Sequence, residues 1–199
     1  LKKFLHIGSS DEYGDKLSPQ SENIREMPLS PYSFSKTSGV HFLQMANKNI
    51  NFPAVSCRIF LSYGPYQDTN RLIPQVIYGC LKDIEFPVSS GQQYRDFCYV
   101  DDVMNGISKL LNSKNTNGEV YNIASAKPVK VRSVIKKIQA LIGTGSPIFG
   151  KNLLRKNEST SLYANINKIK KHTGWIPKTS LDTGLKKTIR YYKKIINAS

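Results

Sequence analysis

The chain alternates short apolar runs with longer stretches in which apolar residues recur every three or four positions. Short runs of this kind predict buried strands, and the longer period predicts helices with one buried face. The predicted strands are 4–8, 54–60, 94–100 and 120–123. The predicted helices are 32–47, 72–81, a segment running through Met104 to Leu111, 131–142, 166–172 and 181–196. Strands that alternate with helices in this way predict an α/β fold.

Composition places the chain among ordinary globular proteins. It has 199 residues, of which 39% are hydrophobic and 22% are charged, enough to bury a substantial core. No apolar run approaches the ~20 residues that a membrane-spanning helix needs, so we expect no membrane partner. The cysteines Cys57, Cys80 and Cys98 lie far apart without metal-ligand spacing, which indicates reduced thiols in a cytoplasmic protein. The first residue is Leu1 and not Met, and we expect the chain to begin inside a longer protein.

The net charge of +15 raises the question of nucleic-acid binding. Residues 1–100 carry ten basic and nine acidic side chains, whereas residues 101–199 carry nineteen basic and five acidic ones. Most of the excess is lysine spread along predicted amphipathic helices, a pattern typical of a solvated face. Only seven of the 29 basic residues are arginine, and no zinc-finger, RNP or arginine-rich signature is present. We therefore expect no nucleic-acid partner and keep salt-dependent DNA binding as an alternative.

Tyr32 and Lys36 form the first candidate for catalysis. Their spacing of four residues puts the phenol and the ammonium on one face of the predicted helix, where the cation favours the phenolate form. On its own, such a pair is usually two exposed side chains without a catalytic role. However, Ser9 follows the first predicted strand, at the carboxyl end where α/β proteins place their sites. The three residues predict a proton-exchange site in which Tyr32 exchanges a proton with a sugar or alcohol hydroxyl, Ser9 polarises the same oxygen, and Lys36 stabilises the phenolate and holds a cofactor ribose.

Further motifs follow along nearly the whole chain. They are Ser-Ser-Asp-Glu-Tyr-Gly at 9–14, Pro-Tyr-x-x-x-Lys at 31–36, Arg-Ile-Phe at 58–60, Tyr-Gly-Pro at 63–65, Arg-Leu-Ile-Pro at 71–74, Arg-Asp-Phe at 95–97, Asp-Asp-Val at 101–103, Tyr-Asn-Ile at 121–123, Arg-x-x-Glu at 155–158 and Gly-Trp-x-Pro at 174–177. Each motif is weak alone. In this order and at these distances the set resembles the carboxyl-terminal part of an extended short-chain dehydrogenase/reductase, of the NAD(P)-dependent nucleotide-sugar epimerase/dehydratase family.

The resemblance implies the carboxyl-terminal part of a Rossmann-like parallel sheet plus a small α/β substrate-binding domain. Residues 1–66 are then the remainder of the Rossmann-like domain, with the Ser/Tyr/Lys elements. Residues 67–199 are mainly the substrate-binding domain, with the 94–113 segment returning to the Rossmann sheet. The family's Gly-x-x-Gly-x-x-Gly turn, which binds dinucleotide phosphates, does not occur in this sequence. We therefore expect this chain alone to bind cofactor weakly and to be inactive, and the full-length protein to be a homodimer.

The same resemblance assigns a role to individual residues. It implies catalytic roles for Ser9, Tyr32 and Lys36, contacts of Tyr32, Lys36 and Phe60 with NAD or NADP, and contacts of Ser9, Asp11, Arg71, Leu72, Arg95 and Arg155 with a nucleotide-sugar substrate. Arg95 and Arg155 would clamp the diphosphate, a task suited to a planar bidentate cation. The alternatives are a purely structural Phe60, a surface ion pair between Arg155 and Glu158, and an ordinary helix start at 71–74. Asp101 and Asp102 are predicted to be helix caps rather than metal ligands, and no metal site is expected.

The implied reaction is hydride and proton transfer at C4 of a nucleotide-linked hexose, by a 4-epimerase or a 4-ketoreductase. Dehydratases of this family carry an acidic pair, or a serine and a glutamate, directly after the catalytic residue, whereas Ser10 and Asp11 follow Ser9 here. Asp11 is one methylene shorter than the glutamate that it would replace, so a 4,6-dehydratase ranks second. A non-catalytic chain that binds a sugar nucleotide or a partner subunit is the remaining alternative.

Overall fold

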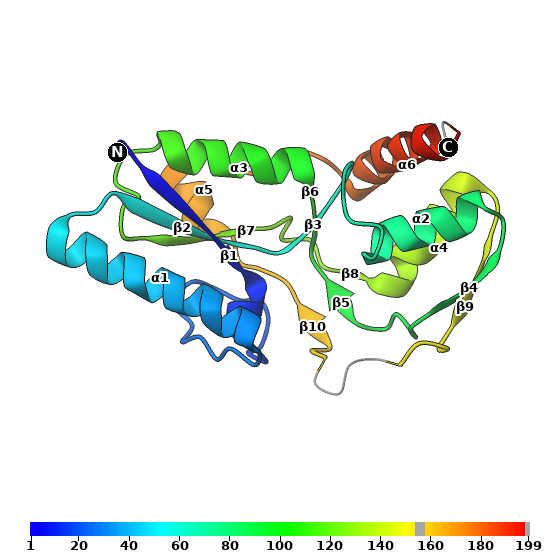
Figure 1. Cartoon of the computed structure of the whole chain (residues 1–199), viewed down its shortest axis with the longest axis horizontal. Coiled ribbons are helices and arrows are strands. Elements are labelled where there is room, and N and C mark those ends of the chain that lie inside the picture. Colours follow the sequence, from blue (N-terminus) through cyan, green and yellow to red (C-terminus); the bar gives the residue numbers. More distant parts are fainter. Residues whose placement is uncertain (154–157, 198–199) are drawn as a thin grey trace.

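The structure is a computed structural model that describes residues 1–153 and 158–197. The molecule is elongated, and its first strand and its last helix lie in opposite halves along the long axis (Figure 1). Strands and helices alternate along the chain, so the predicted α/β fold is confirmed. Within the described residues no helix is both long and apolar enough to cross a lipid bilayer.

One half of the molecule is built on a parallel sheet of three strands. In spatial order the strands are β1 (Phe4–Ser9), β2 (Ala54–Ile59) and β7 (Val120–Ile123). Helix α1 (Pro31–Ile50) packs against one face, and α3 (Val100–Asn112) and α5 (Asn167–Thr173) pack against the other (Figure 1). The central strand β2 is buried almost throughout, as expected for a parallel strand covered on both faces. The carboxyl ends of all three strands meet at one edge of the sheet.

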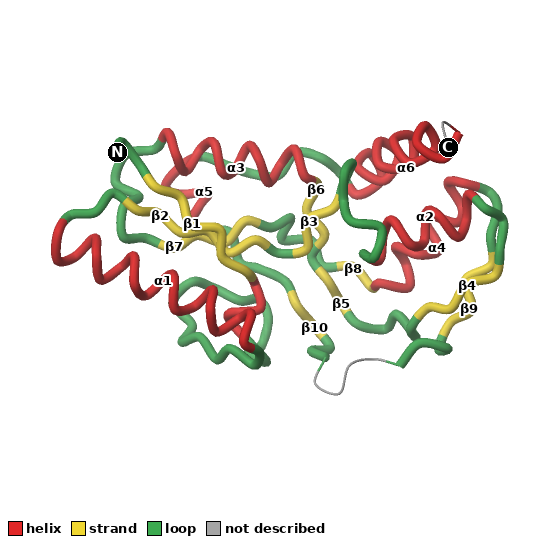
Figure 2. Tube along the Cα trace, viewed as in Figure 1, coloured by secondary structure: helices red, strands yellow, loops and turns green. Residues whose placement is uncertain are grey.

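The other half contains short strands and three helices that share one apolar core (Figure 2). The helices are α2 (Leu72–Leu81), α4 (Val131–Ile142) and α6 (Leu181–Asn197). The strand pairs are β3 (Leu61–Tyr63) with β6 (Phe97–Tyr99), and β4 (Glu85–Val88) with β9 (Ser146–Phe149). Between the halves, β5 (Tyr94–Arg95) lies between β8 (Val129–Lys130) and β10 (Ser161–Leu162).

The extended segment predicted over 94–100 divides into two strands at Asp96. The Asp96 carboxylate is fully buried and accepts backbone N–H groups from Ser125 at 2.7 Å and Ala126 at 2.9 Å. These bonds tie the chain to the loop after β7 and interrupt the strand. Burial raises the pKa of Asp96, and the hydrogen bonds oppose that shift.

The prediction that Asp101 and Asp102 cap a helix is wrong. Helix α3 begins at Val100, and Tyr99 is its N-cap residue without a side-chain capping bond. Both aspartates lie within the first turn, where their negative charge interacts favourably with the positive end of the helix dipole. The Asp102 carboxylate instead accepts the backbone N–H groups of Lys178 at 3.1 Å and Thr179 at 2.8 Å.

Candidate functional site

Ser9 lies at the carboxyl end of β1, where the chain turns into a short 3-10 helix, η1 (Ser10–Tyr13). Ser9 caps this helix, and its Oγ accepts the backbone N–H of Asp11 at 3.1 Å. A serine hydroxyl has one proton to donate besides its acceptor lone pairs. Because Ser9 Oγ accepts the N–H of Asp11 and donates to no acceptor within the described part of the chain, its hydroxyl proton is available for an oxygen of a ligand.

Tyr32 and Lys36 lie in the first turns of α1, which packs against β1 and η1. Ser30 caps this helix and Pro31 occupies its first position, so the sequence fixes where the helix starts. The Lys36 ammonium donates to the carbonyl of Ile7 at 3.0 Å and lies 5.7 Å from the centroid of the Tyr32 ring. The structure thus brings both residues to the end of β1 that carries Ser9.

Two tyrosines lie near this end of the sheet, and they differ in accessibility. Tyr13 is fully buried, and its hydroxyl donates to Oδ1 of Asn122 at 2.8 Å. Burial raises the pKa of Tyr13 to about 12, against the opposing charge of Arg58. Tyr32 is 54% exposed, and its hydroxyl makes no hydrogen bond within the described part of the chain. Tyr32 is therefore the tyrosine that a ligand can reach.

Arg95 approaches the same region from β5. Its guanidinium is almost buried, donates to Glu158 Oε1 at 2.7 Å and donates to the carbonyl of Tyr94 at 2.8 Å. Burial lowers the pKa of Arg95, and the charges of Glu158 and then Asp11 oppose this shift. Arg155 lies outside the described residues.

The remaining predicted residues occupy two different environments. Phe60 directly follows β2, is 3% exposed, and has its ring centroid 6.3 Å from that of Tyr13. Arg71 is exposed at the start of α2, and Leu72 packs partly against the core of α2, α4 and α6. Contact of these residues with cofactor or substrate stays a prediction.

Sequence reasoning missed a buried ionic cluster that is hydrogen-bonded to the backbone of Ser9. Arg58, on β2, donates from Nε to Oε2 of Glu12 at 2.8 Å, and both side chains are fully buried. The Nη2 group of Arg58 is also hydrogen-bonded to Glu26. An arginine inside a largely apolar buried strand needs a buried partner. The arginine at position 58 in the run 54–60 therefore indicated that an acidic partner lies nearby.

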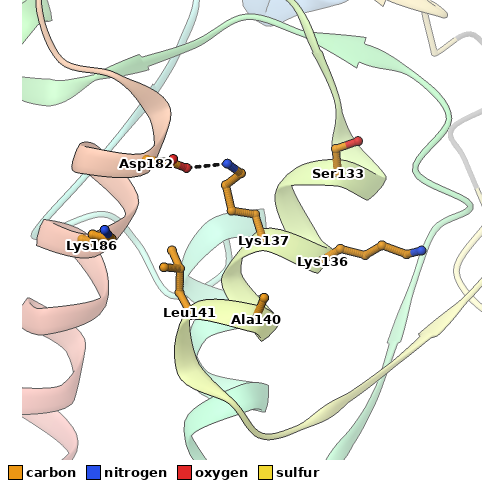
Figure 3. Close-up of a pocket in the computed structure, with 7 residues that line it drawn as sticks. All are labelled: Ser133, Lys136, Lys137, Ala140, Leu141, Asp182 and Lys186. Carbon is orange, nitrogen blue, oxygen red and sulfur yellow. Dashed lines mark hydrogen bonds and ion pairs between the residues drawn. The ribbon is translucent and has the colours of Figure 1, made fainter.

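Two hollows in the described part of the chain lie away from these residues. One, of about 540 Å³, opens between α4 and α6; three of its seven lining residues are lysines, and Lys137 forms an ion pair with Asp182 (Figure 3). The other, of about 690 Å³, lies beside α2 and β4. Neither contains Ser9, Tyr32 or Lys36. Among the described residues no group of three His, Cys, Asp or Glu side chains is arranged to hold a metal ion.

In this structure a strand of a parallel sheet ends at Ser9, next to a helix that carries a Tyr-x-x-x-Lys motif. This is the arrangement of the extended short-chain dehydrogenases/reductases. Comparison with known families makes the assignment more specific. The sequence model described as GDP-mannose 4,6 dehydratase matches residues 1–188, and the chain belongs to that family.

Individual relatives agree with this assignment. An uncharacterized UDP-glucose epimerase of Bacillus subtilis is 30% identical over 196 residues, which are 98% of this chain and 62% of the relative. A dTDP-glucose 4,6-dehydratase of Escherichia coli is 28% identical over 213 residues, covering 96% of this chain and 59% of the relative. The crystal structure of UDP-glucuronic acid 4-epimerase from Bacillus cereus, in complex with UDP-glucuronic acid and NAD, superposes with a TM-score of 0.89 at 33% identity, covering 97% of this chain and 62% of that one. The chain thus spans about three fifths of the length of these relatives.

Proposed function

We propose that this chain carries the catalytic and substrate-binding elements of an NAD(P)-dependent nucleotide-sugar 4-epimerase or 4-ketoreductase. The observation that carries the proposal is the accessible Tyr32, with the Lys36 ammonium beside its ring and a free hydroxyl proton on Ser9 at the adjacent strand end. These groups supply a base, a cation that stabilises the phenolate, and a donor for the same substrate oxygen. Relatives that act on UDP-sugars support a nucleotide-sugar substrate.

Tyr32 is the proposed proton-transfer group. As the phenolate, its oxygen would remove the proton of the substrate C4 hydroxyl, and a bound oxidised nicotinamide cofactor would supply the acceptor for the C4 hydride. Ser9 would donate a hydrogen bond to the C4 oxygen and so hold it in line with Tyr32. If the reduced cofactor returned the hydride to the opposite face of the 4-keto sugar, Tyr32 would donate its proton back to the C4 oxygen, and the C4 epimer would result. A 4-ketoreductase would run only this second half.

A nicotinamide dinucleotide is the cofactor that this chemistry needs, because it accepts and returns the hydride. The donor set fits the ribose of such a molecule. Lys36 has three N–H donors, of which the carbonyl of Ile7 takes one, so others can reach ribose hydroxyls. Phe60 is the proposed contact on the nicotinamide side.

The substrate diphosphate is the proposed ligand of Arg95 and Arg155, and the nucleotide base the proposed ligand of the 71–72 backbone. We infer that Arg95 exchanges its bond with Glu158 for bonds to the diphosphate. Asp11 is exposed beside Ser9, where its carboxylate is available as an additional acid or base. This position favours a 4,6-dehydratase as the second candidate function, and the similarity to dTDP-glucose 4,6-dehydratase supports it.

We further propose residues 1–66 as the remainder of a Rossmann-like domain and residues 67–199 as mainly the substrate-binding domain, with 94–113 returning to the Rossmann sheet. A homodimer is the proposed assembly of the full-length protein. It is supported by an exposed apolar face of α1, on which Phe34 and Phe42 are each 63% exposed. We propose a cytoplasmic location and neither nucleic-acid nor membrane partners.

Product analysis tests the proposed function. The full-length gene product is incubated with NAD⁺ or NADP⁺ and hexoses linked to UDP, dTDP or GDP, and the sugars are identified by NMR. A C4 epimer, or reduction of a 4-keto sugar by the reduced cofactor, supports the proposal, whereas a 4-keto-6-deoxy product supports the dehydratase. Binding of a nucleotide sugar without any turnover would contradict both and favour a non-catalytic role.

A further inference from the structure

The carboxylate of Glu12 contacts Ser9 and the buried Arg58 at the same time. Its Oε1 accepts the backbone N–H of Ser9 at 2.8 Å, and its Oε2 accepts the Nε–H of Arg58 at 2.8 Å. The Glu12 side chain is fully buried. One carboxylate therefore satisfies two donors, of which one belongs to the backbone of the residue proposed to polarise the substrate.

Gly8 makes room for this carboxylate. A Cβ atom at position 8 would lie 2.3 Å from Oε1 of Glu12, far inside van der Waals contact. Gly8 lies in a regular strand, in register with Arg58 on β2, so the glycine is not needed for a left-handed backbone. Its role here is steric: only glycine lets the Glu12 carboxylate reach the N–H of Ser9.

Arg58 pairs with Glu12 inside the protein, where both side chains are fully buried. Its guanidinium lies 4.5 Å from the centroid of the Tyr13 ring, and its Nη2 group is also bonded to Glu26, in the loop before α1. Burial disfavours the charged guanidinium, but Tyr13 and Glu12 more than offset this, so the pKa of Arg58 is raised. Arg58 therefore stays charged at any working pH and keeps Glu12 in place.

We propose that Glu12 is a positioning residue for Ser9. By holding the Ser9 backbone N–H, Glu12 fixes the turn in which the Ser9 hydroxyl accepts the N–H of Asp11 and directs its proton toward the substrate. The catalytic part of this inference rests on the proposed function, whereas the contact itself does not. Loss of the contact leaves substrate binding intact and misaligns the donor to the C4 oxygen.

Two substitutions disturb the contact in independent ways. Glu12→Gln keeps the size of the side chain, but an amide has one acceptor oxygen and cannot serve both donors. Because Arg58 is charged, the amide oxygen turns toward Arg58 and the amide NH₂ faces the N–H of Ser9. Gly8→Ala leaves every charge in place and displaces the carboxylate sterically. Glu26→Gln is the matched control, since Glu26 binds Arg58 as Glu12 does but makes no contact with Ser9.

The first test needs no catalytic activity. Amide hydrogen exchange of the 199-residue chain is followed residue by residue by NMR, and the Ser9 amide is compared with the amides of β2. We expect exchange of Ser9 to rise at least tenfold relative to β2 in Glu12→Gln and in Gly8→Ala, and to stay unchanged in Glu26→Gln. An unchanged Ser9 amide, or an equal rise in the control, would overturn the proposal. If Glu12→Gln does not fold, Gly8→Ala decides the result.

The second test measures kinetics of the full-length gene product. For Glu12→Gln and Gly8→Ala we expect kcat to fall about 10- to 100-fold with KM within twofold of the wild-type value, as for a misplaced catalytic donor. Glu26→Gln should keep kcat, even where its melting temperature falls. A parallel loss of kcat in all three variants would show a merely structural role. Failure of the proposed function would remove this kinetic result and leave the exchange result standing.

Discussion

At the scale of single residues, the site depends on which polar groups are already satisfied by the protein. Tyr13 and Asp96 are buried with their polar atoms bonded to the protein itself, so they stabilise the fold. Tyr32 and the Ser9 hydroxyl proton are left for a ligand. The two tyrosines differ in burial, although both belong to motifs that resemble those of the family.

Glu26 should make the stability of the chain depend on pH. Burial raises the pKa of Glu26, but its backbone hydrogen bond and Arg58 outweigh this, and the pKa is lowered from 4.5. Because the pKa of Glu26 is lower in the folded than in the unfolded chain, the ionised carboxylate stabilises the fold above pH 4.5, the unfolded pKa. This stabilisation is lost as the pH falls through the folded-state pKa. We expect Glu26→Gln to cost about 1–3 kcal/mol at pH 7 and progressively less below pH 4.5.

Urea unfolding at several pH values checks this expectation. The comparison is made in a His41→Gln background, because the His41 imidazole lies 3.5 Å from Glu26 and this contact would otherwise contribute to the measured cost. A cost of Glu26→Gln that stays constant between pH 7 and pH 3 would contradict the assigned role of the carboxylate.

At the scale of elements, periodic helices and apolar strands such as 120–123 could be predicted from sequence, whereas the two-residue strands β8 and β10 could not. The helices over 131–142 and 181–196 carry a repeating apolar face, and the structure forms them with nearly the same ends. The two-residue strands β8 and β10 have no periodicity to detect, because pairing with the distant strand β5 creates them. The roles of Asp96 and Asp102 were missed for the same reason, since their partners lie 29 and 76 residues away.

Asp102 should hold the segment before α6 against α3. Asp102→Asn leaves one acceptor oxygen for the two backbone N–H groups of Lys178 and Thr179, so we expect a loss of about 1–3 kcal/mol in the free energy of unfolding. The neighbouring Asp101 is exposed, and Asp101→Asn is the matched control with an expected change within about 0.5 kcal/mol. Equal losses in the two variants, measured by chemical denaturation, would refute this role for Asp102.

At the scale of the whole molecule, Ser9 ends one strand of a sheet of three described strands, and Tyr32 and Lys36 lie on the helix that packs against that sheet. Strand β1 is at its edge and pairs with β2 alone among the described residues. The motifs predicted the family, and both the fold and the family comparison confirm it. The arginine within the apolar run 54–60 indicated a buried partner, but the motifs could not identify Glu12 as that partner, because the contact depends on how β1 and the following η1 lie against β2.

We expect the 199-residue chain alone to bind NAD(H) weakly and to turn over no nucleotide sugar. The sequence holds no glycine-rich turn for the dinucleotide phosphates, and the open edge of β1 favours association between chains. Fluorescence titration with NADH, together with light scattering to measure the oligomeric state, checks this. Micromolar binding of NADH to a monomer would contradict it.

The central claim is that Tyr32 transfers the proton, and Tyr32→Phe in the full-length gene product tests it most directly. The substitution removes one exposed hydroxyl that makes no bond within the described residues, so the fold and the affinity for nucleotide sugar, measured by calorimetry, should stay nearly unchanged. Because loss of a general acid/base costs about 10²–10⁴-fold, we predict that kcat falls by at least 100-fold. A Tyr32→Phe variant that binds substrate normally and retains most of its kcat would contradict the account.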